Sequence, residues 1–150
     1  MRIIGVDPAL TKSGWAIIDK VSNQNNYIAS GIIKTNSSDP LPVRLKFIFQ
    51  AIEAILNEYE PDIAAIEETF VNKNAATSLK LGCARGAIIS AIAIQDLKVF
   101  EFTPKFIKKS LTGSGAADKM QMLKMISLIM PKAQIKYDDE ADAIAIALAA

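Results

Sequence analysis

The chain has 150 residues with a net charge of +1, and 51% of them are hydrophobic, which is enough to bury one core in a single domain spanning residues 1–150. It has no histidine and one cysteine, Cys83, so an intramolecular disulfide is excluded and a structural zinc site is not expected. No apolar run approaches the roughly 18 residues of a membrane span and no signal peptide is visible, so we expect a cytoplasmic protein that has no membrane partner.

The first third of the chain predicts three short β-strands. Apolar runs at residues 2–7, 15–18 and 27–35 are separated by Gly14 and by the polar stretch 22–26. Short links of this kind favour an antiparallel meander. A proline-rich stretch then ends the β pattern.

The remaining two thirds of the chain alternates strands and helices. At residues 43–59 the apolar side chains recur at helical spacing, and Pro61 ends that helix. The other expected elements are a buried strand at 63–66, a helix at 75–95, a strand at 99–102, a helix that starts at Thr103 and Pro104, a helix at 119–130 and a last helix that starts at Asp138 or Asp139. This order predicts an α/β fold with a mixed five-stranded sheet, built from the antiparallel meander plus parallel strands, and with helices on both faces.

Four carboxylates stand beside apolar segments, where burial is costly without a partner. Asp7 and Glu67 each close a predicted strand, and Asp139 and Asp142 are three positions apart, so they share a face of the last helix. If the two strands pair in parallel, their ends meet at one edge of the sheet. Converging carboxylates would hold Mg²⁺ or Mn²⁺, and a pair of such ions supports phosphodiester cleavage.

Each acid also has an ordinary structural explanation. Asp7 precedes a proline and is a plausible turn residue, and acids at the start of the last helix interact favourably with its dipole. Glu67 and Glu68 could form a solvated strand end. Strand alternation allows only one of these two to join Asp7, and the spacing does not say which.

Several motifs are similar, in the right order, to those of the RuvC family of Holliday junction resolvases. They are Ile4-Gly5-Val6-Asp7-Pro8, Ala65-Ile66-Glu67-Glu68-Thr69-Phe70, Lys73-Asn74-Ala75, Leu79-Lys80-Leu81-Gly82, Ala84-Arg85-Gly86, Gly113-Ser114-Gly115-Ala116-Ala117-Asp118-Lys119 and Asp139-Glu140-Ala141-Asp142-Ala143. The resemblance spans nearly the whole chain. One departure is Ala9, where the family usually has glycine, so the turn after Asp7 is expected to differ slightly.

The resemblance implies an RNase H-like fold, a homodimer, and Mg²⁺-dependent paired nicks across a four-way DNA junction in recombination and repair. We expect that Mn²⁺ can substitute for Mg²⁺ and that each active site binds two ions. A branch-migration motor complex is expected as a further partner. The acidic tetrad that the resemblance implies is Asp7, Glu67, Asp139 and Asp142. This favours Glu67 over Glu68 and leaves Asp138 as a cap of the last helix.

Basic residues dominate the middle of the chain: residues 72–136 contain eleven Lys or Arg and three acids. The resemblance implies that Lys119, at a helix start, and Lys108 face the phosphate near the cut, with Lys119 counted as catalytic. The further DNA contacts that we expect are Phe70, Lys73, Lys80, Arg85, Lys105 and Lys109. Each also has an ordinary explanation. The lysines could form a solvated surface, Phe70 could be a core residue, and Arg85 could be paired within its helix or at a dimer contact.

The helix expected at 75–95 is poor in charge and carries Gly82 and Gly86 four positions apart. Small residues allow close approach, either to the chain's own sheet or, as the resemblance implies, to a second copy across a two-fold axis.

Three other functions stay open at this point. The chain could be another RNase H-like nuclease that acts on RNA or linear DNA, or a non-catalytic junction-binding module. A nucleotide-binding actin-like ATPase is the third, because the region around residues 5–14 faintly resembles a phosphate loop.

Overall fold

The computed structural model describes residues 1–22, 24–69 and 74–150. Its strands are β1 (Arg2–Asp7), β2 (Lys12–Val21), β3 (Gln24–Lys34), β4 (Ile63–Glu67) and β5 (Lys98–Phe102). They form one sheet in the order β3-β2-β1-β4-β5. β2 runs antiparallel to β1 and β3, whereas β4 runs parallel to β1 and β5. The predicted meander followed by parallel strands is confirmed.

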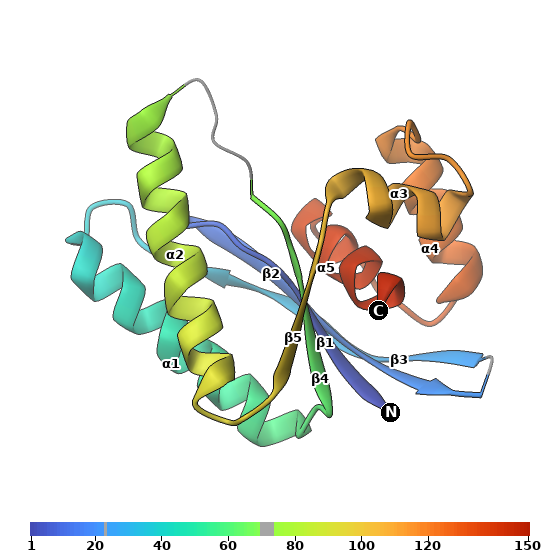
Figure 1. The fold of residues 1–150 in the computed structure, drawn as a ribbon, viewed down its shortest axis with the longest axis horizontal. Coiled ribbons are helices and arrows are strands. Elements are labelled where there is room, and N and C mark those ends of the chain that lie inside the picture. The colour runs from blue at the N-terminus through green and yellow to red at the C-terminus, as the bar shows by residue number, and fades with distance from the viewer. Residues whose placement is uncertain (23, 70–73) are drawn as a thin grey trace.

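Helices cover both faces of this sheet (Figure 1). They are α1 (Leu41–Tyr59), α2 (Ala75–Ala93), α3 (Pro104–Thr112), α4 (Lys119–Ile129) and α5 (Asp138–Ala149). Strand alternation separates two cores: on β1, Ile3 packs with α3, α4 and α5, while Ile4 and Val6 pack with α1 and α2 on the other face. Within the described ranges, each helix is too short or too polar to span a bilayer.

The structure corrects the predicted second strand. β2 covers ten residues, Lys12–Val21, where 15–18 was expected. Gly14 does not separate two strands but lies within β2, opposite Asp7. The glycine is required by a close approach and not by a turn, because a Cβ there would lie 1.9 Å from the carbonyl oxygen of Asp139 on α5.

The first helix also differs from its prediction. α1 begins at Leu41, because Pro40 takes the N-cap position and Pro42 fits in the first turn, where no intrahelical N–H is needed. At its other end Glu60 adopts a left-handed conformation and its N–H donates to the Leu56 carbonyl oxygen (2.9 Å), which closes the helix before Pro61.

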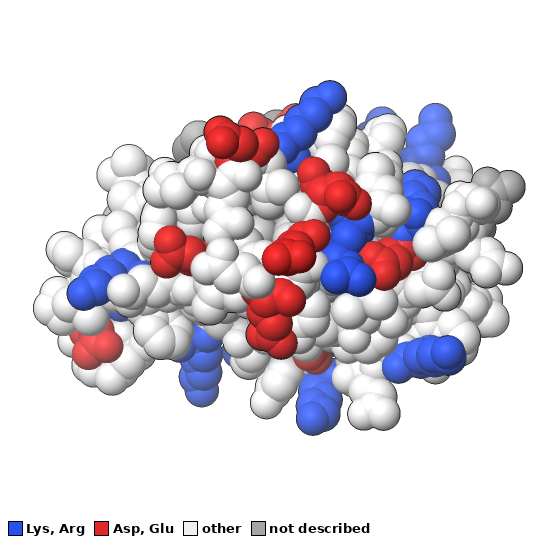
Figure 2. Space-filling model, turned by 90° about the horizontal axis from the view of Figure 1, so that it is seen from below, with Lys and Arg blue, Asp and Glu red and all other residues white. Residues whose placement is uncertain are grey.

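The sheet edge at the amino ends of β1 and β4 is acidic. Arg2 there pairs with Asp19, with 2.9 Å between Nε and Oδ1, and its backbone N–H donates to Asp62. Figure 2, seen from below Figure 1, shows acidic side chains gathered near the middle of this face. A polyanion is therefore expected to approach the opposite edge, at the carboxyl ends of the two strands.

Candidate active site

Asp7 and Glu67 end two neighbouring parallel strands. β1 and β4 pair in register as far as Val6 and Ile66, so the next residue on each strand is a carboxylate. Both side chains are half-buried. The parallel pairing therefore places the two acids at the same edge of the sheet, where open α/β sheets bind their ligands.

Helix α5 brings Asp139 and Asp142 to this edge. The helix lies close to β1 and β2 because each strand has a glycine at the crossing. A Cβ at Gly5 would lie 2.3 Å from a backbone oxygen of α5, and a Cβ at Gly14 would lie 1.9 Å from that of Asp139. Because Gly14 pairs with Asp7 in the β1–β2 ladder, the start of α5 rests beside the strand position that carries Asp7.

The start of α5 is fixed by a buried acid, Glu140. Its carboxylate accepts hydrogen bonds from the backbone N–H groups of Lys136 (2.7 Å) and Tyr137 (2.9 Å). The prediction that Asp138 caps this helix is therefore wrong. Asp138 is the first residue of α5, its carboxylate pairs with a lysine of α4, and Glu140 satisfies the backbone donors before the helix.

Burial, together with the charges of neighbouring acids, raises the pKa of Asp7, Glu67 and Asp142 at this edge. The pKa of Asp7 rises from 3.8 to about 7, and burial is the largest cause. The negative charges of Asp142, Glu67 and Asp139 contribute to that rise, and the positive charge of Lys119 opposes it. Burial also raises the pKa of Glu67, with a contribution from Asp142, and it raises the pKa of Asp142 against the attraction of Lys119. The four charges therefore act on one common region.

Lysines from two helices face these acids. Lys119 is the first residue of α4, and its Nζ lies 2.8 Å from Asp138 Oδ2. This hydrogen bond is the largest cause of the raised pKa of Lys119. Lys108 of α3 acts on two of the acids, because its positive charge lowers the pKa of Glu67 and of Asp142 against the effect of burial.

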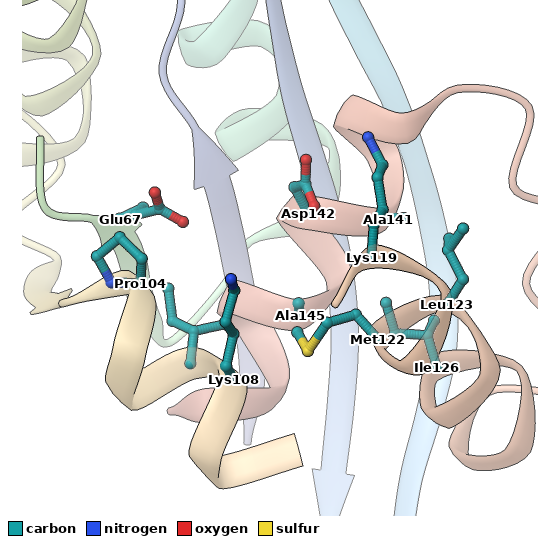
Figure 3. Close-up of a pocket in the computed structure, with 11 residues that line it drawn as sticks. Glu67, Pro104, Lys108, Lys119, Met122, Leu123, Ile126, Ala141, Asp142 and Ala145 are labelled. Atoms are coloured by element: carbon teal, nitrogen blue, oxygen red, sulfur yellow. The ribbon is translucent and has the colours of Figure 1, made fainter. Parts of the chain in front are cut away.

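A cavity of about 230 Å³ opens beside the acids (Figure 3). Glu67, Asp142, Lys108 and Lys119 line its charged side, and the carboxylate of Glu67 extends toward Asp142. The apolar wall is made by Pro104, Ile107, Met122, Leu123, Ile126, Ala141 and Ala145. Such a wall lowers the local dielectric constant, which strengthens interactions between charges at the rim.

The donor set fits a hard divalent cation held by oxygen. Burial and, after it, neighbouring negative charges raise the pKa of Asp7, and a bound cation would offset those charges. In the part of the chain that the structure describes, however, no three Asp, Glu, His or Cys side chains are close enough together to hold a metal ion. Asp142, Glu67 and Asp139 all act on Asp7, so the four acids share one electrostatic environment. Their carboxylate oxygens would have to move closer together to bind an ion.

Side chains that the sequence analysis missed fix the turn after β1. Ser13 Oγ donates to the carbonyl oxygen of Ala9 (2.5 Å) and accepts from its N–H (3.0 Å). The buried Arg44 reaches from α1 and donates to the carbonyl oxygen of Leu10 (3.2 Å). Ala9 is not among the described residues with positive φ, so the alanine fits without backbone strain. The available signal was the position of Arg44, one helical turn before the apolar Ile48.

The expected DNA contacts on α3 are accessible. Lys105 and Lys109 are exposed on the same helix as Lys108. Phe70 and Lys73, which were expected to stack on a base and to bind phosphate, lie outside the described residues.

The expected contacts on α2 lie on the other face of the sheet. Lys80 is exposed there. Arg85 reaches β5, where its guanidinium forms an ion pair with Glu101. This arginine thus has an intramolecular partner on a strand, and sequence spacing gave no sign of that partner because the two residues meet only through the fold.

Known proteins share both sequence and fold with this chain. The family model described as crossover junction endodeoxyribonuclease RuvC matches residues 3–150. A protein of that name from Rickettsia massiliae is 54% identical over 148 residues, which cover 98% of this chain and 94% of that protein. Thermus thermophilus RuvC in complex with Holliday junction substrate is 28% identical, with a TM-score of 0.93 over 99% of this chain and 92% of that one. The yeast mitochondrial Holliday junction resolvase, 10% identical with a TM-score of 0.74 over 98% and 76% of the two chains, shares the fold.

Proposed function

Because this chain belongs to the RuvC family of crossover junction endodeoxyribonucleases, we propose that it resolves four-way DNA junctions in recombination and repair. One observation carries this proposal: parallel pairing and the close seating of α5 bring carboxylates from β1, β4 and α5 to a single edge of the sheet, where burial and the charges of the other acids raise the pKa of Asp7. A protein that only bound DNA phosphates would gain nothing from converging negative charges. The arrangement therefore favours a nuclease over a binding module.

The metal ligands in this proposal are Asp7, Glu67, Asp139 and Asp142. They would hold two Mg²⁺ ions, or Mn²⁺ in their place, because hard cations prefer oxygen donors and the chain has no histidine. When bound, such ions supply an activated water and stabilise the departing oxygen of the cleaved bond. The chain itself contributes the ends of β1 and β4, together with helix α5, which packs closely on the sheet at two glycines. These elements position the four carboxylates.

Lys119 and Lys108 would hold the phosphate that is cut. Both line the charged side of the cavity next to Asp142 (Figure 3), so a phosphate at the acids lies within their reach. Their positive charges would stabilise the negative charge that develops on the phosphoryl oxygens. We propose that the remaining predicted contacts also bind the DNA; they are Phe70, Lys73, Lys80, Arg85, Lys105 and Lys109. Arg85 would have to exchange Glu101 for phosphate.

Cutting of three labelled substrates tests this function. A synthetic four-way junction, a linear duplex of the same sequence and an RNA–DNA hybrid are each incubated with the protein, in Mg²⁺ and in EDTA. We expect paired nicks in the junction, only in the presence of the metal. Equal cutting of the hybrid or the duplex would favour a different RNase H-like nuclease, and junction binding without cutting in Mg²⁺ or Mn²⁺ would favour a binding module.

Symmetric nicks require a second active site, and α2 offers a surface for a homodimer. Leu79 is 72% exposed on this helix. A Cβ added at Gly82 or Gly86 would meet nothing within 4 Å among the described residues of the chain. An apolar helix face with open glycines allows another helix to approach closely. A two-fold dimer through α2 would match the pseudo-two-fold symmetry of a four-way junction.

Bulky residues at the two α2 glycines are expected to prevent dimerisation without unfolding the chain. Gly82→Leu together with Gly86→Leu has space within the monomer and improves helix propensity by about 1 kcal/mol per glycine removed. Sedimentation should therefore show a monomer with an unchanged or higher melting temperature. Ala54→Leu, an exposed small residue on α1, is the matched control and should remain dimeric. A dimeric double variant would show that α2 is not the interface.

Two further expectations rest on the family alone. We propose that the branch-migration motor complex of junction processing is a partner, and that the protein works in the cytoplasm together with its DNA substrate.

A further inference from the structure

A lysine that the family motifs do not include contacts the acidic site from β2. Lys12 is the first residue of that strand. Its Nζ lies 3.8 Å from Asp139 Oδ2 and 5.3 Å from the centroid of the Tyr137 ring. The side chains of Lys12 and Asp139 are 39% and 30% exposed, so the ion pair is accessible from solvent and weak. A stronger anion can therefore take Lys12 away from Asp139.

A second lysine, Lys34, faces the same space. It lies directly opposite Lys12 in the pairing of β2 with β3. Its neighbour Ile33 packs with α1 and α2, so alternation turns Lys34 toward the α5 side of the sheet, where Lys12 contacts α5. Like charges directly opposite each other on neighbouring strands destabilise a sheet. An anion bound between these lysines would turn that repulsion into attraction.

The sheet order sets this lysine pair apart from the lysines already described. Lys108 belongs to α3, which follows β5, the outermost strand on one side of the sheet. Lys34 belongs to β3, the outermost strand on the other side. Asp7 and Glu67 end the strands β1 and β4 that lie between them. Four strand spacings of about 4.8 Å separate β3 from β5, roughly 19 Å, which corresponds to about six nucleotides along a duplex strand. One DNA strand can therefore contact Lys108 on one side and the pair Lys12 and Lys34 on the other while it crosses the acids.

We propose that Lys12 and Lys34 form a phosphate-binding pair for the backbone of the junction strand, on the β2–β3 side of the acidic site. This inference rests on the proposed function and adds residues that position the strand. Lys12 is then the partner of Asp139 in the free protein and of a DNA phosphate in the complex. The Tyr137 ring keeps the ammonium group at the edge of the site in both states.

The salt dependence of junction binding tests this pair. Anisotropy titrations with a labelled four-way junction are run in EDTA, so that the DNA stays uncut, from about 50 to about 200 mM salt. Lys12→Met and Lys34→Met should each bind several-fold more weakly, with a plot of log affinity against log salt that is shallower by about one. Lys12→Arg should retain the wild-type slope. Lys20→Met is the matched control, because Lys20 lies on the same strand roughly 26 Å away and should change nothing.

The location of the phosphate provides a second readout. Neutral methylphosphonates are placed one at a time around the cleavage position. At the position that Lys12 contacts, neutralisation should weaken the wild type but not Lys12→Met. The inference is overturned if both lysine variants keep the wild-type salt slope, or if every methylphosphonate weakens wild type and Lys12→Met equally. Failure of the proposed function is a different result: the wild type would then bind the junction no more tightly than a linear duplex.

Discussion

Replacing Asp7 with asparagine is expected to reduce junction cutting by at least about a thousandfold, because loss of a metal ligand removes several kcal/mol of transition-state stabilisation and each 1.4 kcal/mol is about tenfold in rate. Asn keeps the shape of the side chain and removes a charge that repels DNA. Junction affinity should therefore be retained or improved. Single-turnover cutting in Mg²⁺ and anisotropy titrations in EDTA measure the two effects separately.

Glu68→Gln is the matched control for this experiment. Glu68 follows the predicted ligand Glu67 directly, its backbone N–H pairs with the carbonyl oxygen of Phe102, and it contributes to none of the raised pKa values at the site. It should cut at nearly the wild-type rate. Rapid cutting by Asp7→Asn, or equal losses in the two variants, would contradict the assignment of Asp7 as a metal ligand.

The same Asp7 variant should be more stable than the wild type when metal is absent. In the unfolded chain Asp7 loses its proton near pH 4, and in the folded chain near pH 7, so the folded state binds that proton more tightly. The stability from this group is fully present below about pH 4 and is lost as the pH rises through about 7. The rise of the Asp7 pKa from 3.8 to about 7 corresponds to at most about 4 kcal/mol. We expect roughly 2 kcal/mol, because the four acids titrate together.

Urea denaturation at several pH values measures this effect. From about pH 5 to about pH 8, wild-type protein in EDTA should lose more unfolding free energy than Asp7→Asn. Mg²⁺ should restore most of the loss in the wild type and little in the variant. Parallel pH profiles of the two proteins would show that Asp7 is not held in a repulsive cluster.

Gly14→Ala should disable the site without changing any acid. The new Cβ would lie 1.9 Å from the Asp139 carbonyl oxygen, and this is a backbone atom of α5 that cannot rotate away. The helix start must therefore move away from β2 and take Asp139 and Asp142 with it. We expect a loss of about 1–3 kcal/mol in stability and at least about a hundredfold in cutting rate.

Gly31→Ala is a sharp comparison for this substitution. Its Cβ would also come close to another atom, at 2.9 Å, but the neighbour is the Trp15 side chain, which can shift. This variant should fold and cut almost normally. Cutting rate and melting temperature are measured for both variants. If Gly14→Ala cuts like Gly31→Ala, then the close seating of α5 on β2 is not what positions the acids.

Local patterns predicted much of this fold. Runs that end in a carboxylate located β1 and β4, and helical periodicity located α1. The errors arose where a residue's role depends on a distant neighbour. Gly14 looked like a break between strands, yet it lies within β2 because α5 crosses there. Asp138 looked like a helix cap, yet the buried Glu140 takes that role through the backbone before the helix.

The candidate acidic site could likewise be predicted only in part. Strand ends and helical spacing indicated all four carboxylates, while the choice of Glu67 over Glu68 required the family resemblance. Lys12 and Arg44 were not recognised as part of the site, because their partners on α5 and in the turn after β1 are close only in the folded chain. Tertiary contacts of this kind leave no periodic signal in the sequence.

The placement of the acids on β1 and α5 also has a consequence during synthesis on the ribosome. Asp7 belongs to the first strand of the described chain, and Asp139 and Asp142 belong to its last helix. The core on the α5 side cannot close until that helix has emerged from the exit tunnel, since α5 supplies many of its buried residues. If the four acids hold the metal as proposed, a growing chain lacks a complete set of ligands, and cutting can begin only after α5 has been translated and has docked on the sheet.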